Sequence, residues 1–271
     1  MTYLILSVFF SILIANILRK VSARDKDIYV IFWGNYLVAS IYSLFSGGMI
    51  EFEKVHTPDI LLGALTGLLF LINFFIYSKN INVNGLSISV SAMRISVLIP
   101  IVVSILFFAE NLTLLKSLGI FIILCAFYQM GRKGTIKSIK WVLFLFLCTG
   151  ITDSCLKFYD FYFFNSLNIF LFFTFFTAFL FNTGVVLFTR SKMRLKTVLI
   201  GIMLGIPNCL TSLFFMKALG NMSAIYAYPF FASNLVLFSI ISDIVFWKRR
   251  FTFREGLLFV LLITGIIFLN I

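Results

Sequence analysis

The sequence predicts an all-α integral membrane protein with ten transmembrane helices, built from two inverted five-helix repeats. Three observations support this prediction. Of 271 residues, 61% are hydrophobic and only 12% are charged, whereas a typical soluble domain carries about 25% charged residues. Apolar runs of about 17–25 residues, the length that crosses a bilayer, follow one another along the whole chain. The chain also aligns with itself at an offset of 138 residues.

The ten apolar runs are separated by short linkers, which leave no room for a soluble domain. We therefore expect one transmembrane domain, with the first repeat in residues 1–135 and the second in residues 136–271. The expected spans, in chain order, are 2–18, 28–50, 60–78, 85–108, 114–130, 141–161, 166–189, 197–218, 222–247 and 255–271.

Paired glycines mark the internal repeat. At the offset of 138, Gly63 and Gly67 of the third run align with Gly201 and Gly205 of the eighth. Such G-x-x-x-G pairs let helices approach closely, and we interpret them as packing sites. Because each half holds an odd number of spans, the second half enters the membrane from the opposite side. Inverted repeats of this kind occur in secondary transporters, whose substrate site lies near the bilayer midplane.

The formal charge of +12 is unevenly distributed. Lys and Arg cluster in the linkers after spans 1, 5, 7 and 9, and with Lys79 that side holds 17 of the 22 basic residues. The positive-inside rule places these linkers in the cytoplasm and both termini outside. Attraction to anionic membrane lipids accounts for the excess charge, so no nucleic-acid partner is expected. We expect a bacterial or archaeal inner membrane protein.

One stretch resembles a known family. The sequence "SVSAMRISVLIPIVVSILFFAENLTLLKSLGIFIILCAF" has a mid-helix Pro100, a helix-ending Glu110 and Gly119 in the following helix. It resembles the drug/metabolite transporter superfamily in its EamA-like branch. The resemblance implies a central cavity lined mainly by spans 1, 3, 4, 6, 8 and 9, and efflux of amino acids or related metabolites. The second half departs from the family pattern, with Lys248 where the Glu would repeat and Phe238 where the Pro would. Many relatives also have both termini in the cytoplasm, opposite to the charge asymmetry here.

Two ionisable residues fall near the predicted midplane. Arg94 lies about 13 Å and Asp153 about 18 Å from the cytoplasmic end of their spans, at 1.5 Å per residue. Intramembrane charges are costly and usually face a cavity or a partner. Arg94 could bind an anionic substrate group, pair structurally with Asp153, or extend along its helix to the interface. Asp153 could carry a coupling proton. Lys157 and Asp160 follow at i+4 and i+7, and Lys157 is interpreted as an interfacial anchor or a coupling residue.

Uncharged polar residues lie on the spans that line the family's cavity. Each is either a bridge between helices, worth about 0.6 kcal/mol, or a ligand contact. Pro100 and Pro229 are expected to interrupt spans 4 and 9, where a bend serves gating. With Arg94 and Asp153, the candidate substrate-binding residues are Asn16, Asn73, Ser96, Asn208, Thr211, Tyr226 and Asn234.

Motifs of enzymes and ATPases are absent from the sequence. We find no phosphate-binding loop, no zinc-protease motif and no nucleophile elbow, so we expect no enzyme, no cofactor and no metal site. The leading hypothesis is a secondary transporter, independent of ATP, that moves a small polar or zwitterionic, amino-acid-like metabolite by alternating access. The alternatives are a flippase or exchanger of a sugar- or phosphate-bearing compound, and a non-transporting membrane receptor or enzyme. The expected partners are a small-molecule substrate, membrane lipids and a proton or counter-flowing substrate, with the chain a monomer or weak homodimer.

Overall fold

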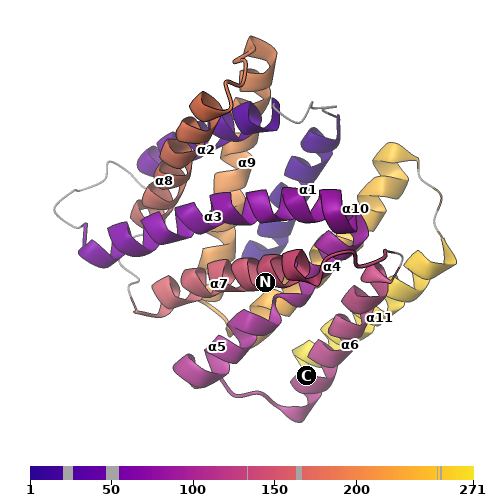
Figure 1. Ribbon diagram of the computed structural model, residues 1–271. Coiled ribbons are helices and arrows are strands. Elements are labelled where there is room, and N and C mark those ends of the chain that lie inside the picture. Colours follow the sequence, from indigo (N-terminus) through magenta and orange to yellow (C-terminus); the bar gives the residue numbers. More distant parts are fainter. Residues whose placement is uncertain (21–26, 47–54, 133, 163–166, 249, 251) are drawn as a thin grey trace. The chain divides into compact units, whose positions relative to one another are not determined.

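The computed structural model describes residues 1–20, 27–46, 55–132, 134–162, 167–248, 250 and 252–271, and it is all-helical (Figure 1). Within these residues nine segments are long and apolar enough to cross a membrane, and α1 is a shorter apolar helix. This is the helix content of a multi-pass membrane protein. The expected span residues 47–50 and 166 lie outside the described residues. The helices are α1 Thr2–Lys20, α2 Asp27–Phe45, α3 Thr57–Asn84, α4 Leu86–Ile95, α5 Leu98–Phe108, α6 Leu114–Gly131, α7 Ile139–Tyr162, α8 Leu167–Phe188, α9 Leu195–Leu219, α10 Ala224–Trp247 and α11 Phe253–Asn270.

The fourth expected span is two helices, α4 and α5, that meet at residues 96–97. Pro100 has no N–H to donate to the carbonyl of Ser96, four residues earlier. That carbonyl instead accepts the N–H of Ile99 at 2.9 Å, a tighter i→i−3 bond. The expected interruption at Pro100 is therefore present, one turn before the proline itself.

The expected interruption at Pro229 was wrong, because α10 runs unbroken from Ala224 to Trp247 with the proline inside it. The proline lies near the start of the helix, where it removes only the bond to the carbonyl of Ile225. The N–H groups of Ala224 and Ile225 are held by the carboxylate of Glu110. A single missing bond beside a secured helix end does not break the helix.

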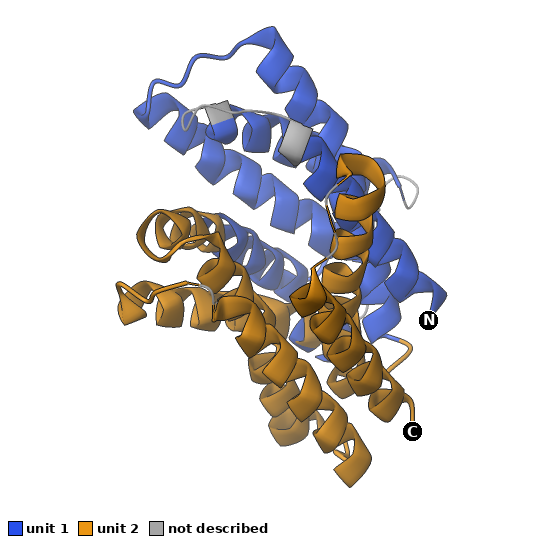
Figure 2. Ribbon diagram, turned by 90° about the vertical axis from the view of Figure 1, so that its right-hand side faces the viewer, with its two compact units in different colours: residues 1–71, 158–220 blue, residues 72–157, 221–271 orange. Residues whose placement is uncertain are grey.

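The chain forms two compact units, coloured separately in Figure 2. Unit 1 comprises residues 1–71 and 158–220, and unit 2 comprises residues 72–157 and 221–271. In unit 1, α2 packs against α8 and α9, and α1 packs against α9. In unit 2, α6 packs against α4 and α11, and α10 contacts α5, α6 and α11.

The paired glycines make close helix contacts in unit 1. A Cβ atom added at Gly67 of α3 would lie 2.1 Å from the carbonyl oxygen of Thr174 in α8. A Cβ atom added at Gly201 of α9 would lie 2.3 Å from the carbonyl oxygen of Ile31 in α2. Both distances are far inside van der Waals contact, so glycine lets these backbones touch, as the packing interpretation predicts.

Candidate functional site

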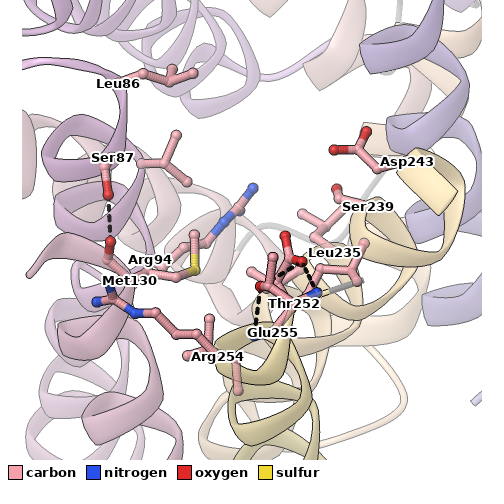
Figure 3. A pocket seen from close by; sticks show the side chains of 14 residues that line it. Leu86, Ser87, Arg94, Met130, Leu235, Ser239, Asp243, Thr252, Arg254 and Glu255 are labelled. Atoms are coloured by element: carbon pink, nitrogen blue, oxygen red, sulfur yellow. Dashed lines mark hydrogen bonds between the residues drawn. The ribbon is translucent and has the colours of Figure 1, made fainter. Parts of the chain in front are cut away.

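A cavity of about 610 Å³ lies within unit 2, bordered by α4, α10 and the start of α11. Its wall combines apolar side chains with two basic and two acidic residues, a mixture suited to a small polar ligand. Figure 3 shows this cavity with its side chains drawn as sticks. The polar and charged residues that line it are Ser87, Arg94, Ser239, Asp243, Thr252, Arg254 and Glu255.

Arg94 comes from the last turn of α4. The partial negative charge at a helix C-terminus favours a cation there, so the break between α4 and α5 helps to hold the guanidinium within an apolar segment. The Nε atom of Arg94 is buried and has no hydrogen-bond partner in the described part of the chain. Its guanidinium points into the cavity from α4 (Figure 3). A buried donor without a partner costs about 1–3 kcal/mol, more when charged, and a ligand could satisfy it.

Asp153 and Tyr77 are the electrostatic neighbours of Arg94. Asp153 lies on α7, and its backbone carbonyl accepts the hydroxyl of Tyr228 at 2.5 Å. The structure thus brings together the two charges that the sequence singled out. Among the described residues, however, Arg94 forms no ion pair within 4.0 Å. The two side chains interact at longer range, with the Asp153 side chain outside the lining of the cavity.

Three further charges line the cavity. Glu255 forms a capping box with Thr252 at the start of α11, accepting its N–H at 2.9 Å and its hydroxyl at 2.8 Å. Arg254 donates to the carbonyl of Gln129. Asp243, on α10, directs its carboxylate into the same space as Arg94 from the opposite wall (Figure 3).

Asp243 was missed by the sequence analysis. It lies in a long apolar run, only five residues before the basic stretch "KRR", and such a position resembles a helix end at the membrane surface. The criterion that selected Arg94, an ionisable residue inside a spanning helix, would have selected Asp243 as well.

A second charged cluster in unit 2 is built around Glu110, which follows Ala109, the C-cap residue of α5. Its two carboxylate oxygens accept the N–H groups of Ala224 at 2.9 Å and Ile225 at 3.0 Å. Lys157 of α7 places its Nζ 3.5 Å from Oε1 of the same carboxylate, with the two side chains 7% and 13% exposed. The ammonium also lies over the ring of Phe108. Glu110 therefore joins α5, α7 and the positive N-terminus of α10.

Lys157 is buried within the protein and paired with Glu110. Its interpretation as an interfacial anchor or a coupling residue stays a prediction. The stripe of charges on α7 did not reveal this partner, because Glu110 is distant in the sequence and lies in the segment between α5 and α6.

Several of the uncharged candidate residues bond within or between helices. In unit 2, Asn73 accepts the hydroxyl of Thr149 at 2.9 Å, which joins α3 to α7. The hydroxyl of Ser96 donates to the carbonyl of Met93 at 2.6 Å, at the break between α4 and α5. Neither residue lines the cavity of Arg94.

The other two uncharged candidates in unit 2 both lie on α10, and the side chain of each forms a hydrogen bond. Tyr226 donates to Oδ1 of Asn270 at 3.0 Å, and Asn234 donates to the carbonyl of Phe230, one turn earlier, at 2.8 Å. Both remain partly exposed.

Three candidates belong to unit 1. Asn16 donates to the carbonyl of Ile12 at 2.9 Å, and the carbonyl of Thr211 accepts the hydroxyl of Ser7 at 2.7 Å, which joins α9 to α1. Asn208 is half-buried and forms no side-chain hydrogen bond within the described segments. These residues stay candidates for ligand contact.

Metal binding finds no support in the described residues, which contain no group of three or more His, Cys, Asp or Glu side chains able to hold an ion. The cavity of Arg94 instead offers hydrogen-bond donors, three hydroxyl groups and charges of both signs. This arrangement can bind a small ligand and orient it.

Comparison with known proteins finds structures with a similar fold but no matching family. No family model and no curated protein matches the chain. Among solved structures 27 chains are similar to it. One of these, described only as the crystal structure of a protein, superposes with a TM-score of 0.80 at 12% sequence identity, over 99% of this chain and 96% of that chain. At this identity the likeness establishes a shared fold alone.

Proposed function

We propose that this protein is a secondary transporter that moves a small polar or zwitterionic, amino-acid-like metabolite across the membrane by alternating access. The observation that carries the proposal is Arg94, whose buried Nε has no partner in the described residues and whose guanidinium faces a polar cavity within unit 2. A fixed cation without an ion pair has a high free-energy cost inside a membrane protein. An anionic group of a bound substrate would offset that cost. The resemblance to the drug/metabolite transporter superfamily supports the same assignment.

The charge balance of the cavity favours a zwitterion over a phosphate-bearing compound. Arg94 and Arg254 contribute two positive charges, and Asp243 and Glu255 contribute two negative charges. A zwitterionic ligand has no net charge, so the cavity stays neutral when it binds. A phosphate monoester, with a charge near −2 at neutral pH, would meet two carboxylates in the same small space. The flippase or exchanger of phosphorylated compounds is therefore the weaker candidate.

Positions of helix ends support the inverted repeat on which the proposal depends. Helix α3 begins at Thr57 and α9 at Leu195, and α4 begins at Leu86 and α10 at Ala224, a separation of 138 residues in both cases. The glycine contacts recur as well, with α3 against α8 and α9 against α2. In a five-helix repeat, span 3 corresponds to span 8 and span 2 corresponds to span 7. The contact of α3 (span 3) with α8 (span 7) is therefore repeated by the contact of α9 (span 8) with α2 (span 2).

The break between α4 and α5 supports a transport role for the site. Interrupted helices place backbone groups and helix ends at the substrate site in many secondary transporters. Here the break follows directly after Arg94, so a change at residues 96–97 would move the guanidinium relative to α5. From α6, α10 and α11 the cavity is lined by residues near the helix ends that adjoin the basic linkers. We propose that these linkers are cytoplasmic.

Counterflow in proteoliposomes tests the proposal. Vesicles containing the purified protein and a high internal concentration of one unlabelled amino acid should accumulate the same labelled amino acid from outside, without ATP. Protein-free vesicles provide the control. A receptor or an enzyme would give no accumulation with any of the twenty amino acids, and that result would reject the proposal.

A further inference from the structure

A second cavity, of about 390 Å³, lies within unit 2 between α4, α6 and the segment that connects α6 to α7. One face of α4 forms a wall of it, since Ile88, Ala92 and Ile95 follow one another at i, i+4 and i+7. The cavity of Arg94 is lined by other residues of α4, and the two cavities share no lining residue. The proposed transport mechanism makes no use of this second cavity.

The second cavity lies where helices of unit 2 end. Helix α6 ends at Gly131, which borders the cavity, and α7 begins at Ile139. Tyr128, Arg132 and Ile136 also line it, and Tyr128 and Ile136 are 64% and 53% exposed. Tyrosine is enriched where a membrane meets water, because its ring is apolar and its hydroxyl is polar. In a bilayer we therefore expect this cavity at the depth of the lipid headgroups.

The segment beside the second cavity carries positive charge that the protein does not neutralise. Residues 131–140, "GRKGTIKSIK", contain four basic residues, and no acidic residue occurs between Glu110 and Asp153 in the sequence. Within the part of the chain that the structure describes, the guanidinium of Arg132 forms no hydrogen bond and no ion pair. Lys137 and Lys140 are exposed as well. An anion is the ligand that complements such a wall.

The described part of this segment is fastened to the helices behind it. Asn84, which ends α3 and is 4% exposed, accepts the N–H groups of Lys137 and Ser138 at 2.8 Å each and donates to the carbonyl of Ser138 at 2.9 Å. A Cβ atom added at Gly134 would lie 2.6 Å from the side chain of Ile88 in α4. The backbone that carries the positive charges is therefore held at a fixed place beside the cavity.

We propose that the second cavity binds the headgroup of an anionic phospholipid, with the phosphate at Arg132. Basic pockets between transmembrane helices bind such headgroups, and the planar fork of arginine suits two phosphate oxygens. An acyl chain can then extend along α6, where Phe121 and Tyr128 lie two turns apart on one face and are each 64% exposed. The inference is independent of the proposed transport function.

Thermal unfolding of the purified full-length protein in a neutral detergent tests the inference. The probes are phosphatidylglycerol, which is anionic, and phosphatidylcholine with the same acyl chains, which has no net charge. A ligand that binds only the folded state raises the melting temperature. We expect phosphatidylglycerol to bind at least about fivefold more tightly, the factor that corresponds to one basic residue near an anionic lipid surface. Glycerol phosphate, a headgroup without acyl chains, should have no effect at the same concentration.

Two isoleucines of the same segment give a matched pair of variants. Ile136 and Ile139 are both 53% exposed, but only Ile136 lines the cavity. Ile136→Glu places a negative charge at the proposed phosphate position and should weaken binding of phosphatidylglycerol at least about fivefold. Ile139→Glu makes the same change of charge outside the cavity, where salt screens it, and should weaken binding about twofold or less. Neither variant should change the melting temperature without lipid by more than about 2 °C, because exposed substitutions have small effects.

A second pair of variants removes one positive charge. Arg132→Gln should weaken binding of phosphatidylglycerol at least about fivefold. Its control is Arg190→Gln, an exposed arginine just after the end of α8 that lines neither cavity, and its effect should be about twofold or less.

Three results would overturn the inference. Equal binding of the two lipids would show that charge does not select the ligand. Equal effects within both pairs of variants would show attraction to the basic segments in general and no site at the cavity. Stabilisation by glycerol phosphate as large as that by phosphatidylglycerol would show a site for a free phosphate compound and no lipid site.

Discussion

Neutralising Glu110 should destabilise the protein strongly, because its carboxylate holds three helices together. Glu110→Gln keeps the size of the side chain but removes the charge that faces Lys157 at 3.5 Å and weakens two bonds to the start of α10. Removing one member of a buried ion pair costs about 3–5 kcal/mol. At roughly 2–4 °C per kcal/mol for a chain of this size, the melting temperature should fall by about 6 °C or more.

The assay is thermal unfolding of the purified variants in one detergent. The double variant Glu110→Gln with Lys157→Gln should recover part of the loss, because no buried ammonium then lacks its carboxylate. The matched control is Lys79→Gln, which removes an exposed cation that lies over the ring of Trp141 and should cost about 1 kcal/mol or less. A melting temperature of Glu110→Gln within 1 °C of wild type, or a double variant less stable than the single variant, would refute this account of the cluster.

Gly67→Ala should lower the melting temperature by several degrees, since its Cβ would lie 2.1 Å from the carbonyl oxygen of Thr174, whereas Gly184→Ala, with open space around it, should not; equal effects would contradict the packing argument. If the protein is a transporter and Asp153 carries its coupling proton, Asp153→Asn should abolish pH-driven flux while exchange of substrate persists, and an unchanged pH dependence would exclude it as the coupling residue. A reporter at the C-terminus that is active only in the cytoplasm should stay dark, because the positive-inside rule predicts the basic linkers on the cytoplasmic side; a bright signal would reverse the orientation.

The helices followed closely from the sequence because length and apolar composition largely determine a membrane span. Each expected span corresponds to a helix, and the fourth is divided near Pro100 as the proline suggested. Pro229 shows the limit of that argument. A proline breaks a helix only when the freed carbonyl and the neighbouring turns are not otherwise held, and the stabilising contact from Glu110 comes from the distant segment between α5 and α6.

The site was predictable only in part. Arg94 and Asp153 stood out as charges in apolar runs, and the structure makes them electrostatic neighbours. The pairing of Lys157 with Glu110 joins residues far apart in the chain, and nothing in the local pattern of α7 indicates which helix lies opposite it. The cavity itself depends on side chains from α4, α10 and α11 meeting in three dimensions, which no spacing along one helix encodes.

Counterflow by Arg94 variants tests the central claim most directly, namely that Arg94 binds the anionic group of a transported substrate. Lysine keeps the positive charge but loses the planar arrangement of five donors. We predict that Arg94→Lys retains the melting temperature of the wild type within a few degrees and loses at least about tenfold in counterflow of amino acids. If instead Arg94→Ala lowers the melting temperature, and adding Asp153→Ala restores both stability and counterflow, Arg94 only stabilises the helix bundle and the claim is wrong.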